Sequence, residues 1–320
     1  MAPVAEIILL ILGLPIIVKS ADLFVDGSSN IAYNLKIPAI IVGLTIVAFG
    51  TSAPEISTSL SLISNNQTAE VVGNIVGSNI FNILAVIGIS TLIGSLAVKK
   101  ELIKRDFPFL IIATIGLFLI AMKYGELTSR YGLIFLILII AYVIYLVIEA
   151  RKNKEEMAKE VEIELPMNKA IIYTIIGLIG IIIGSILVGG NIETITEAYG
   201  IKEGIIGFTL IAISTSLPEL ITSINAFKKG EDGLVIGNVL GSSIFNILFI
   251  LGICSLWEAI PFEGWRIDIL FMSVVTIVVA AFAYTQNEID KKEGIVLLIL
   301  YIAYMTFACC RLMGMIQVSF

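Results

Sequence analysis

The chain has 320 residues, of which 58% are hydrophobic and 14% charged, and its mean hydropathy is +1.02. Soluble globular domains carry roughly 25% charged residues, so this composition excludes a water-soluble protein and indicates an integral membrane protein. The net charge of −6 comes with no basic stripe, which argues against a nucleic-acid partner, and the lack of histidine excludes imidazole metal sites and Ser-His-Asp catalysis.

Ten mostly apolar runs follow one another along the chain, each near the ~20 residues that a transmembrane helix needs. The runs cover residues 4–25, 38–63, 71–97, 107–122, 131–149, 169–190, 203–227, 234–256, 267–285 and 294–312. The sequence therefore predicts an all-α membrane protein with ten transmembrane helices.

Lysine and arginine are distributed unevenly between the two sides of these spans. Fourteen lie on the side of the central loop and five on the other, with Lys19 inside the first run. Because cytoplasmic loops carry the excess of basic residues, we expect a cytoplasmic central loop and both termini outside. The expected location is the cell (plasma) membrane, crossed several times.

A long internal repeat relates the two halves of the chain. Residues 43–90 align without a gap on residues 207–254, and 21 of the 48 positions are identical. The shared positions are mostly polar or small, so the apolar composition of membrane segments does not explain them.

The repeat also predicts how the chain is divided. We expect a first five-helix repeat at 1–150, a short charged linker at 151–168 and a second five-helix repeat at 169–320. An odd number of spans in each repeat forces the two copies into opposite orientations. Inverted repeats are the usual construction of secondary transporters, whose substrate sites lie near the midplane between the copies.

A Thr-Ser-x-Pro-Glu motif lies in the middle of one span in each repeat, as Thr51–Glu55 and Thr215–Glu219. Pro54 and Pro218 lack an N–H and are expected to break their helices, which frees backbone carbonyls. In hydrocarbon, freed carbonyls are tolerated only where something satisfies them, and a cation can do so. The threonine and the glutamate of each motif lie four residues apart and so share one helix face with those carbonyls.

The next span of each repeat carries a polar stripe at a spacing of four. The stripes are Asn74, Ser78 and Asn82 in the first repeat and Asn238, Ser242 and Asn246 in the second. Together with the motifs they offer carboxylate, hydroxyl, amide and carbonyl oxygens, which are the ligands of a hard cation such as calcium.

Several of these residues also have a purely structural interpretation. The glycines Gly73, Gly77, Gly237 and Gly241 form small-xxx-small patterns that are typical of close helix packing. Serines and asparagines can simply bond neighbouring helices, and the prolines can be ordinary kinks. Glu55 and Glu219 differ, because a carboxylate at the membrane centre costs about 2.5–3.5 kcal/mol and marks a functional site.

Four other carboxylates lie near predicted span ends, and we expect water around them: Glu149, Glu193, Glu258 and Asp268.

The motifs GTSAPE with GNIVGSNIFNIL, and STSLPE with GNVLGSSIFNIL, resemble the two α-repeats of the calcium/cation antiporter superfamily. They are most similar to those of its prokaryotic sodium/calcium exchanger branch. The resemblance covers essentially the whole chain. It implies a ten-helix exchanger with four ion sites at the centre.

The resemblance also implies ligands. Calcium is expected on Glu55 and Glu219 with the carbonyls of Thr51 and Thr215. An outer sodium site is implied at Ser78, Thr215, Ser216, Glu219 and the Ala212 carbonyl. An inner sodium site is implied at Ala48, Thr51, Ser52, Glu55 and Ser242. A central site for water or sodium is implied at Asn82 and Asn246.

Some relatives, including potassium-dependent exchangers, carry aspartate where this chain has Asn246, so the amide argues against potassium co-transport. With an amide at this position, the centre holds two carboxylates, those of Glu55 and Glu219. Calcium would neutralise both of them, whereas three sodium ions would leave one positive charge. A three-for-one exchange, which the family implies, is therefore electrogenic.

The leading hypothesis is a secondary antiporter that exchanges Na⁺ for Ca²⁺ by alternating access, with no cofactor and no obligate protein partner. One alternative is a Ca²⁺/H⁺ antiporter, because two adjacent glutamates in a dry site can share a proton. The proton-coupled relatives, however, usually carry a GNxxE motif that this chain lacks. Another alternative is a cation channel, which conducts without counter-transport. No catalytic set is present, so an enzyme is not expected.

Overall fold

The computed structural model describes residues 4–152, 164–198, 212–312 and 315–316. Within these ranges, eight helices are long and apolar enough to cross a membrane, or nine if one bent pair counts as a single span. The chain is thus an all-α, multi-pass membrane protein. The expected span at 203–227 begins within residues 199–211, which lie outside the described residues, and the expected linker is described only at its two ends.

The first half of the chain contains eleven of the helical elements together with two very short strands. Its helical elements are α1 (Val4–Leu35), α2 (Ala39–Val42), η1 (Gly43–Val47), α3 (Ala48–Thr51), α4 (Ala53–Ser64), α5 (Thr68–Ile80), η2 (Phe81–Val86), α6 (Ile87–Ile93), η3 (Leu102–Asp106), α7 (Phe107–Tyr124) and α8 (Ser129–Lys152). Its strands are β1 (Leu96–Ala97) and β2 (Glu126–Leu127).

The described part of the second half follows the same order. Its helical elements are α10 (Met167–Ala198), α12 (Ala212–Thr215), α13 (Leu217–Lys228), α14 (Asp232–Phe245), η5 (Asn246–Ile250), α15 (Leu251–Trp257), α16 (Arg266–Gln286) and α17 (Lys291–Leu312). Its strands are β3 (Ile260–Pro261) and β4 (Glu288–Ile289).

Each proline motif breaks its span at the serine before it. The helix axis bends by 43° between Thr51 and Ala53, and Ser52 there has φ −78° and ψ 5°. Ser216 takes the same conformation, with φ −90° and ψ 5°, between α12 and α13. Both prolines lie in the first turn of the following helix, where a missing N–H costs no hydrogen bond. The predicted helix-breaking role of Pro54 and Pro218 agrees with this geometry.

The two spans that carry the polar stripes each contain a π-helical turn, η2 and η5. A π turn inserts one extra residue into a helix and is frequent at functional sites. Asn82 is the second residue of η2, and Asn246 is the first residue of η5. Each π turn therefore contains one of the two asparagines that are predicted for the central site.

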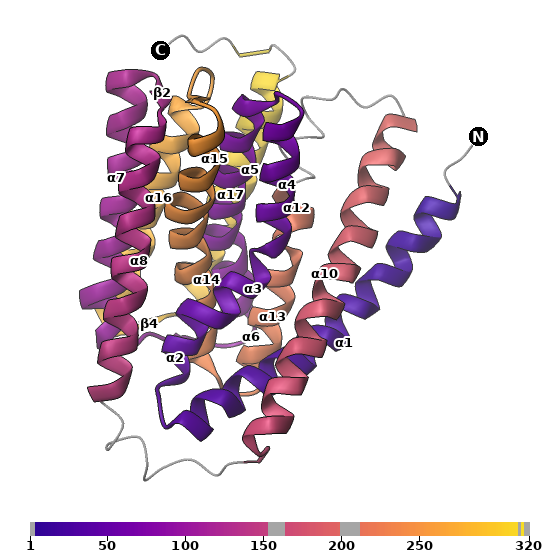
Figure 1. Cartoon of the computed structure of the whole chain (residues 1–320), viewed down its shortest axis with the longest axis vertical. Helices are drawn as coiled ribbons and strands as arrows, with labels where there is room; N and C mark the ends of the chain where they lie inside the picture. Colours follow the sequence, from indigo (N-terminus) through magenta and orange to yellow (C-terminus); the bar gives the residue numbers. More distant parts are fainter. Residues whose placement is uncertain (1–3, 153–163, 199–211, 313–314, 317–320) are drawn as a thin grey trace.

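The first helices of the two halves, α1 and α10, run antiparallel and pack along each other as a tilted pair beside the main bundle (Figure 1). Each has 32 residues, or about 48 Å at 1.5 Å per residue, which exceeds the ~30 Å hydrocarbon core. The pair packs closely because a Cβ at Gly27 would lie 2.4 Å from the Thr174 backbone nitrogen, and one at Gly177 would lie 2.6 Å from that of Phe24.

The first span is longer than predicted, because α1 continues to Leu35 instead of ending near residue 25. The polar residues in this extension give the sequence the character of a loop. In the structure Ser28, Ser29 and Asn30 are buried. Helix packing has therefore overridden the local polarity.

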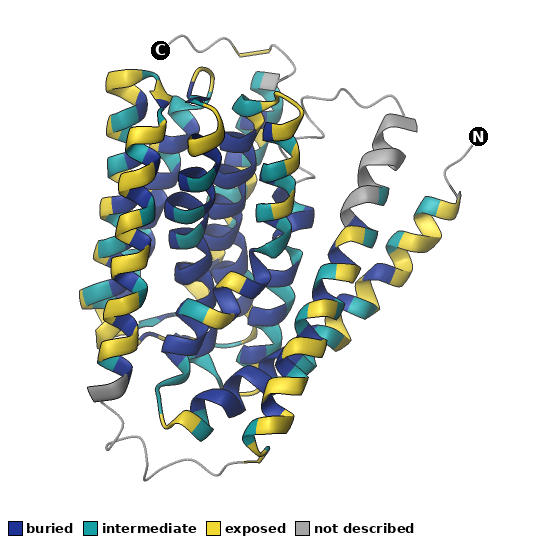
Figure 2. Ribbon diagram, in the orientation of Figure 1, coloured by how far each residue is buried: buried dark blue, intermediate teal, exposed yellow. Residues whose placement is uncertain are grey.

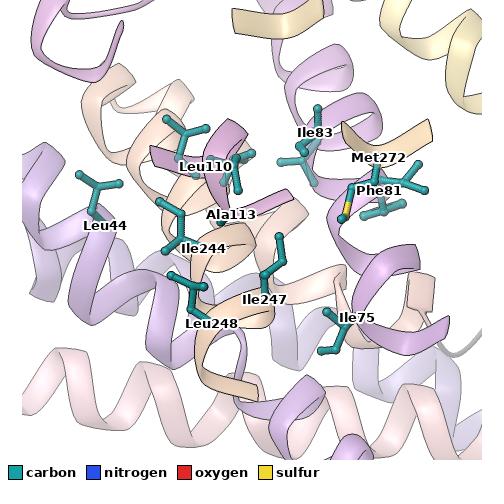
Figure 3. Packing of buried hydrophobic residues seen from close by; sticks show 14 of the residues in the cluster. Leu44, Ile75, Phe81, Ile83, Leu110, Ala113, Ile244, Ile247, Leu248 and Met272 are labelled. Carbon is teal, nitrogen blue, oxygen red and sulfur yellow. The ribbon is translucent and has the colours of Figure 1, made fainter. Parts of the chain in front are cut away.

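The core lies between the broken spans and the polar-stripe spans, where nearly every residue is buried, whereas the outer helices expose apolar faces (Figure 2). Apolar side chains from η1, α5, η2, α7, α14, η5 and α16 belong to one buried cluster, of which Figure 3 labels Leu44, Ile75, Phe81, Ile83, Leu110, Ala113, Ile244, Ile247, Leu248 and Met272. Exposed leucine and isoleucine on the outer helices suit a lipid-facing surface.

Two short ribbons join the halves through their loops. β1 pairs antiparallel with β4, and β2 pairs antiparallel with β3, so each ribbon takes one strand from each half. The exchange is reciprocal, as expected of two copies related by a two-fold axis.

A partly buried ion-pair cluster joins η3 and the start of α7 to α8. Both carboxylate oxygens of Asp106 accept hydrogen bonds from the Arg105 guanidinium at 2.8 Å, and Oδ1 also accepts one from the Tyr142 hydroxyl at 2.6 Å. Arg105 also contacts Glu149, and Phe109 stacks on Tyr142 with ring centres 4.4 Å apart.

An equivalent cluster fastens α16 to α17. Both oxygens of Asp268 accept hydrogen bonds from Arg311, at 2.7 and 3.0 Å, and Oδ1 accepts one from Tyr304 at 2.9 Å. Phe271 stacks on Tyr304 at 4.7 Å. The expectation that Asp268 is solvated is therefore wrong, because its side chain is fully buried against a cation that lies 43 residues away in sequence.

Candidate functional site

The residues predicted to bind ions all lie in the buried centre of the bundle. Each has 7% or less of its surface exposed, and most have none. They come from the two broken spans and from the two polar-stripe spans: Ala48, Thr51, Ser52, Glu55, Ser78, Asn82, Ala212, Thr215, Ser216, Glu219, Ser242 and Asn246.

The two glutamates are each bound by the serine at the helix break of the opposite repeat. The Ser216 hydroxyl donates to Oε1 of Glu55 at 2.9 Å, and the Ser52 hydroxyl donates to Oε1 of Glu219 at 3.3 Å. The predicted sets place each serine with the glutamate of its own motif, whereas the structure pairs them crosswise. The crossing brings the two broken spans together at one point.

On one side of this point, Thr51 connects its own broken span to α14. Its hydroxyl donates to Oδ1 of Asn238 at 2.9 Å and lies 3.3 Å from the Ser242 hydroxyl. Ser242 in turn lies 3.4 Å from the Ala48 carbonyl oxygen. Three members of the predicted inner sodium set (Ala48, Thr51 and Ser242) are thus in mutual contact.

The other side repeats only part of this arrangement, because Oδ1 of Asn74 has no partner among the described residues. The Thr215 hydroxyl donates to the Ala212 carbonyl at 3.2 Å and lies 3.4 Å from the Ser78 hydroxyl. Within the predicted outer sodium set, Thr215 therefore contacts both Ser78 and Ala212.

Two further asparagines hold the glutamate backbones in place. Asn74 donates through Nδ2 to the Glu55 carbonyl at 3.3 Å and to Ser59 at 3.0 Å. Asn238 does the same with the Glu219 carbonyl at 3.3 Å and with Ser223 at 3.1 Å. These contacts join each broken span to the polar-stripe span that follows it.

Close helix approach makes these contacts possible on the α14 side. A Cβ at Gly241 would lie 2.7 Å from the Ala48 Cβ and 2.8 Å from the Leu44 backbone. Gly237 packs in the same way on the backbone of Ile40 and Gly43. The packing interpretation of the glycine patterns therefore holds for Gly237 and Gly241 on α14. On α5, Gly73 faces the ring of Trp265 and so packs on a side chain instead of a helix backbone.

Several buried oxygens at the centre have no hydrogen-bond partner among the described residues. They are Oε2 of Glu55, Oε2 of Glu219, Oδ1 of Asn74, Oδ1 of Asn82 and Oδ1 of Asn246. Burying an unpaired polar group costs free energy, and an unpaired carboxylate costs much more. None of the ion pairs formed by the described residues involves either glutamate.

The donor set fits a hard cation. It offers two carboxylates, several hydroxyls, amide oxygens and backbone carbonyls, and calcium takes six to eight such oxygens. Within the described ranges no three His, Cys, Asp or Glu side chains gather as a metal site, so most of the oxygens gathered here are neutral. A site with only two charged ligands and many neutral oxygens suits an ion that must also leave.

Comparison with known proteins agrees with this chemistry. The family model described as "Sodium/calcium exchanger protein" matches residues 5–148 and 169–310. A putative antiporter, CaxA of Alkalimonas amylolytica, is 37% identical over 312 residues, which cover 93% of this chain and 96% of that protein. The inner membrane protein YrbG of Escherichia coli is 32% identical over 87% of this chain and 89% of its own length.

The fold matches that of a solved exchanger. The structure of the sodium-calcium exchanger NCX_Mj soaked with 10 mM Na⁺ and 10 mM Sr²⁺ superimposes with a TM-score of 0.84 at 32% identity. The match covers 96% of this chain and 99% of that one.

Proposed function

Because this chain belongs to the sodium/calcium exchanger family, whose members are transporters and not enzymes, we propose that it exchanges Na⁺ for Ca²⁺ across the membrane by alternating access. It is a cation exchanger of the prokaryotic sodium/calcium exchanger branch within the calcium/cation antiporter superfamily. The resemblance seen in the sequence motifs is thus confirmed, and the choice of coupling ion is the step that we propose.

One observation carries the proposal. Glu55 and Glu219 are fully buried, each has one oxygen bound by a serine, and each has a second oxygen without a partner in the described part of the chain. A buried carboxylate needs a cation or a proton. We infer that the transported ions supply the positive charge.

The proposed calcium ligands are Glu55, Glu219 and the backbone carbonyls of Thr51 and Thr215. Sodium is assigned to an outer set that includes Glu219 and to an inner set that includes Glu55, with the central site of Asn82 and Asn246 between them. The contacts among Ala48, Thr51 and Ser242, and among Ala212, Thr215 and Ser78, support the two sets. Because calcium needs the same two carboxylates that the sodium sets use, sodium and calcium compete.

The charge of the site gives the expected electrical behaviour. Calcium balances two carboxylates, whereas three sodium ions leave one net positive charge to cross with them. Moving that charge through the membrane potential changes the free energy by about 2.3 kcal/mol per 100 mV. Asn246 adds no charge, so we propose exchange that is independent of potassium.

We further propose ten spans arranged as two inverted five-helix repeats at 1–150 and 169–320, with the linker 151–168 in the cytoplasm and both termini outside. The antiparallel α1 and α10 and the reciprocal β1–β4 and β2–β3 ribbons support the inversion. The relative named as an inner membrane protein supports placement in the cell membrane.

The test is uptake of calcium-45 into proteoliposomes loaded with sodium, while external sodium, potassium and pH are varied separately. We expect uptake that requires the outward sodium gradient, ignores potassium and speeds up when the inside is made positive. Uptake that follows a pH gradient and ignores sodium would assign the chain to Ca²⁺/H⁺ antiport. Flux that persists without an exchangeable ion on the far side would indicate a channel.

A further inference from the structure

Asn79 of α5 lies beside the central site but is not among the predicted ligands. Its side chain is fully buried and spans the contact between the two polar-stripe spans. Its Nδ2 donates to the Ser243 backbone carbonyl at 3.1 Å, and its Oδ1 accepts from Nδ2 of Asn246 at 3.0 Å.

These two contacts fix which way both amides point. A backbone carbonyl can only accept a hydrogen bond, so Asn79 must turn its NH₂ group toward Ser243. The Asn79 oxygen then faces Asn246, which must donate a hydrogen bond through its own NH₂ group. The Oδ1 of Asn246 is thereby turned away from Asn79, and it is buried without a partner among the described residues.

The equivalent asparagine of the first repeat has no such support. Asn82 corresponds to Asn246, and neither atom of its amide has a hydrogen-bond partner in the described ranges. The residue that corresponds to Asn79 is Ser243, whose short hydroxyl is likewise without a partner there. The two central asparagines are therefore equivalent in sequence but not in their surroundings.

We propose that Asn79 is a positioning residue that presets the carbonyl oxygen of Asn246 toward the cation in the central site. The proposal rests on the proposed function, since it assumes that Asn246 faces transported ions. A preset ligand loses little side-chain freedom when the ion arrives, and this raises affinity without a new contact. Asn82, by contrast, must be turned by the ion or by water.

The arrangement also explains why an amide suits position 246. An aspartate there would place a carboxylate oxygen against Oδ1 of Asn79, which is about 3.0 Å from the present nitrogen. Asn79 cannot turn its NH₂ group to meet it without giving up the Ser243 carbonyl. We therefore expect Asn246→Asp to be tolerated better when Asn79 is replaced by serine.

The experiment measures calcium-45 binding to purified protein, and its displacement by sodium, for the wild type, Asn79→Ser, Asn246→Ala and the double variant. Immobilising a side chain corresponds to about a twofold to tenfold change in affinity. We expect Asn79→Ser and Asn246→Ala each to raise the half-inhibitory sodium concentration by about that factor. The double variant should show no further loss, because Asn79 acts through Asn246.

A swap variant separates positioning from mere packing. In Asn79→Ser/Ser243→Asn, the asparagine moves to the equivalent place in the other repeat, where it can hold Asn82 instead. We expect sodium competition to return to within about twofold of the wild type, with a melting temperature near that of Asn79→Ser. Recovery of ion affinity without recovery of stability cannot come from packing.

Normal sodium and calcium binding by a folded Asn79→Ser variant would overturn the proposal. A double variant whose loss of sodium affinity equals the product of the two single losses would overturn it as well. If calcium binds to the wild type but sodium fails to displace it, sodium coupling is wrong. The proposal for Asn79 then fails with it, because Asn246 belongs to the proposed site for sodium or water and not to the proposed calcium ligands.

Discussion

Buried carboxylates occur in two kinds of place in this molecule, and the difference separates function from structure. Asp106 and Asp268 each accept two hydrogen bonds from an arginine and one from a tyrosine. Glu55 and Glu219 are buried just as fully, but each has a serine on one oxygen and no partner for the other among the described residues. A carboxylate whose charge is balanced locally holds helices together, whereas one left unbalanced needs an ion from outside.

The largest expected effect comes from neutralising a central carboxylate. Glu55→Gln or Glu219→Gln should lower calcium-45 uptake by about a hundredfold or more, because removing one side of a buried charge interaction costs 2–5 kcal/mol. The ion-free protein should keep or gain thermal stability, since an unbalanced buried charge disappears.

The matched control is Glu258→Gln, which neutralises a carboxylate that is exposed to solvent. It should transport normally. Normal transport by either central variant would remove the glutamates from the proposed site.

The opposite result is expected at the ion-pair cluster of Asp268, Tyr304 and Arg311. Asp268→Asn should lower the free energy of unfolding by about 3–5 kcal/mol, because the partly buried Arg311 is left without its counter-charge. Calcium affinity per folded molecule should stay within about twofold, because the side chain of Asp268 is bound by Tyr304 and Arg311 and not by the predicted ion ligands. Thermal unfolding and calcium binding measured on the same sample test both halves of the prediction.

Tyr304→Phe provides the milder control, since it removes one hydrogen bond to Asp268 and leaves the ion pair in place. A loss of about 1.5–3 kcal/mol is expected for a bond to a charged group. Loss of calcium binding by folded Asp268→Asn would show that this ion-pair cluster is part of the ion-binding site.

Between these extremes lie the asparagines that hold the glutamate backbones. Asn238 uses Nδ2 for two acceptors and accepts a bond from Thr51, whereas Asn74 has no partner for its oxygen in the described part of the chain. Asn238→Ala should therefore cost about 1 kcal/mol more than Asn74→Ala in unfolding free energy. Equal losses measured by thermal unfolding would mean that the Thr51 contact contributes nothing.

The smallest effect is expected at an exposed ion pair between α1 and the loop after α13. The Lys229 ammonium lies 2.7 Å from Asp22 and 2.6 Å from Asp26. Burial lowers the pKa of Lys229, but the hydrogen bonds to the two aspartates outweigh it and raise that pKa above its usual value. The resulting stabilisation is complete below the unfolded pKa of about 10.4 and is lost as pH rises through the folded pKa.

Because this pair is solvent-exposed, Lys229→Met should cost less than about 1 kcal/mol at low salt, and the loss should shrink at high salt. Lys228→Met, at the neighbouring position, should cost less still, since Lys228 makes none of the ion pairs of the described residues. Unfolding at two ionic strengths measures the difference. A salt-independent loss would contradict an electrostatic origin.

The residues at the centre of the molecule could be singled out from the sequence because the centre is duplicated. Proline, glutamate and the spaced asparagines each have a local chemical reason to be where they are, and each occurs twice at one offset. The helix breaks at Ser52 and Ser216 follow directly from Pro54 and Pro218.

The two ion-pair clusters, around Asp106 and Asp268, were missed because the residues that meet in each cluster are far apart in sequence. Asp268 meets Tyr304 and Arg311 only after two helices have packed, so it resembled a solvated end of a span. A signal existed nevertheless: Asp106 and Tyr142 recur as Asp268 and Tyr304, both 162 residues further on. That offset differs from the 164 of the central repeat and escapes an ungapped alignment.

Other features have no sequence signal of their own. The crosswise pairing of Ser52 with Glu219, and of Ser216 with Glu55, depends on how the two repeats meet in space. The π turns at Asn82 and Asn246 leave no composition pattern. The role of Asn79 depends on one backbone carbonyl of a distant helix.

One measurement tests the contrast between balanced and unbalanced carboxylates most directly: thermal unfolding of the wild type, Glu219→Gln and Asp268→Asn across a calcium titration. A ligand that binds only the folded state stabilises it by about 2.7 kcal/mol at a hundredfold excess over its Kd. We predict the same calcium-dependent increment for the wild type and for Asp268→Asn, which starts lower, and none for Glu219→Gln. A full increment in Glu219→Gln, or none in Asp268→Asn, would contradict the assignment.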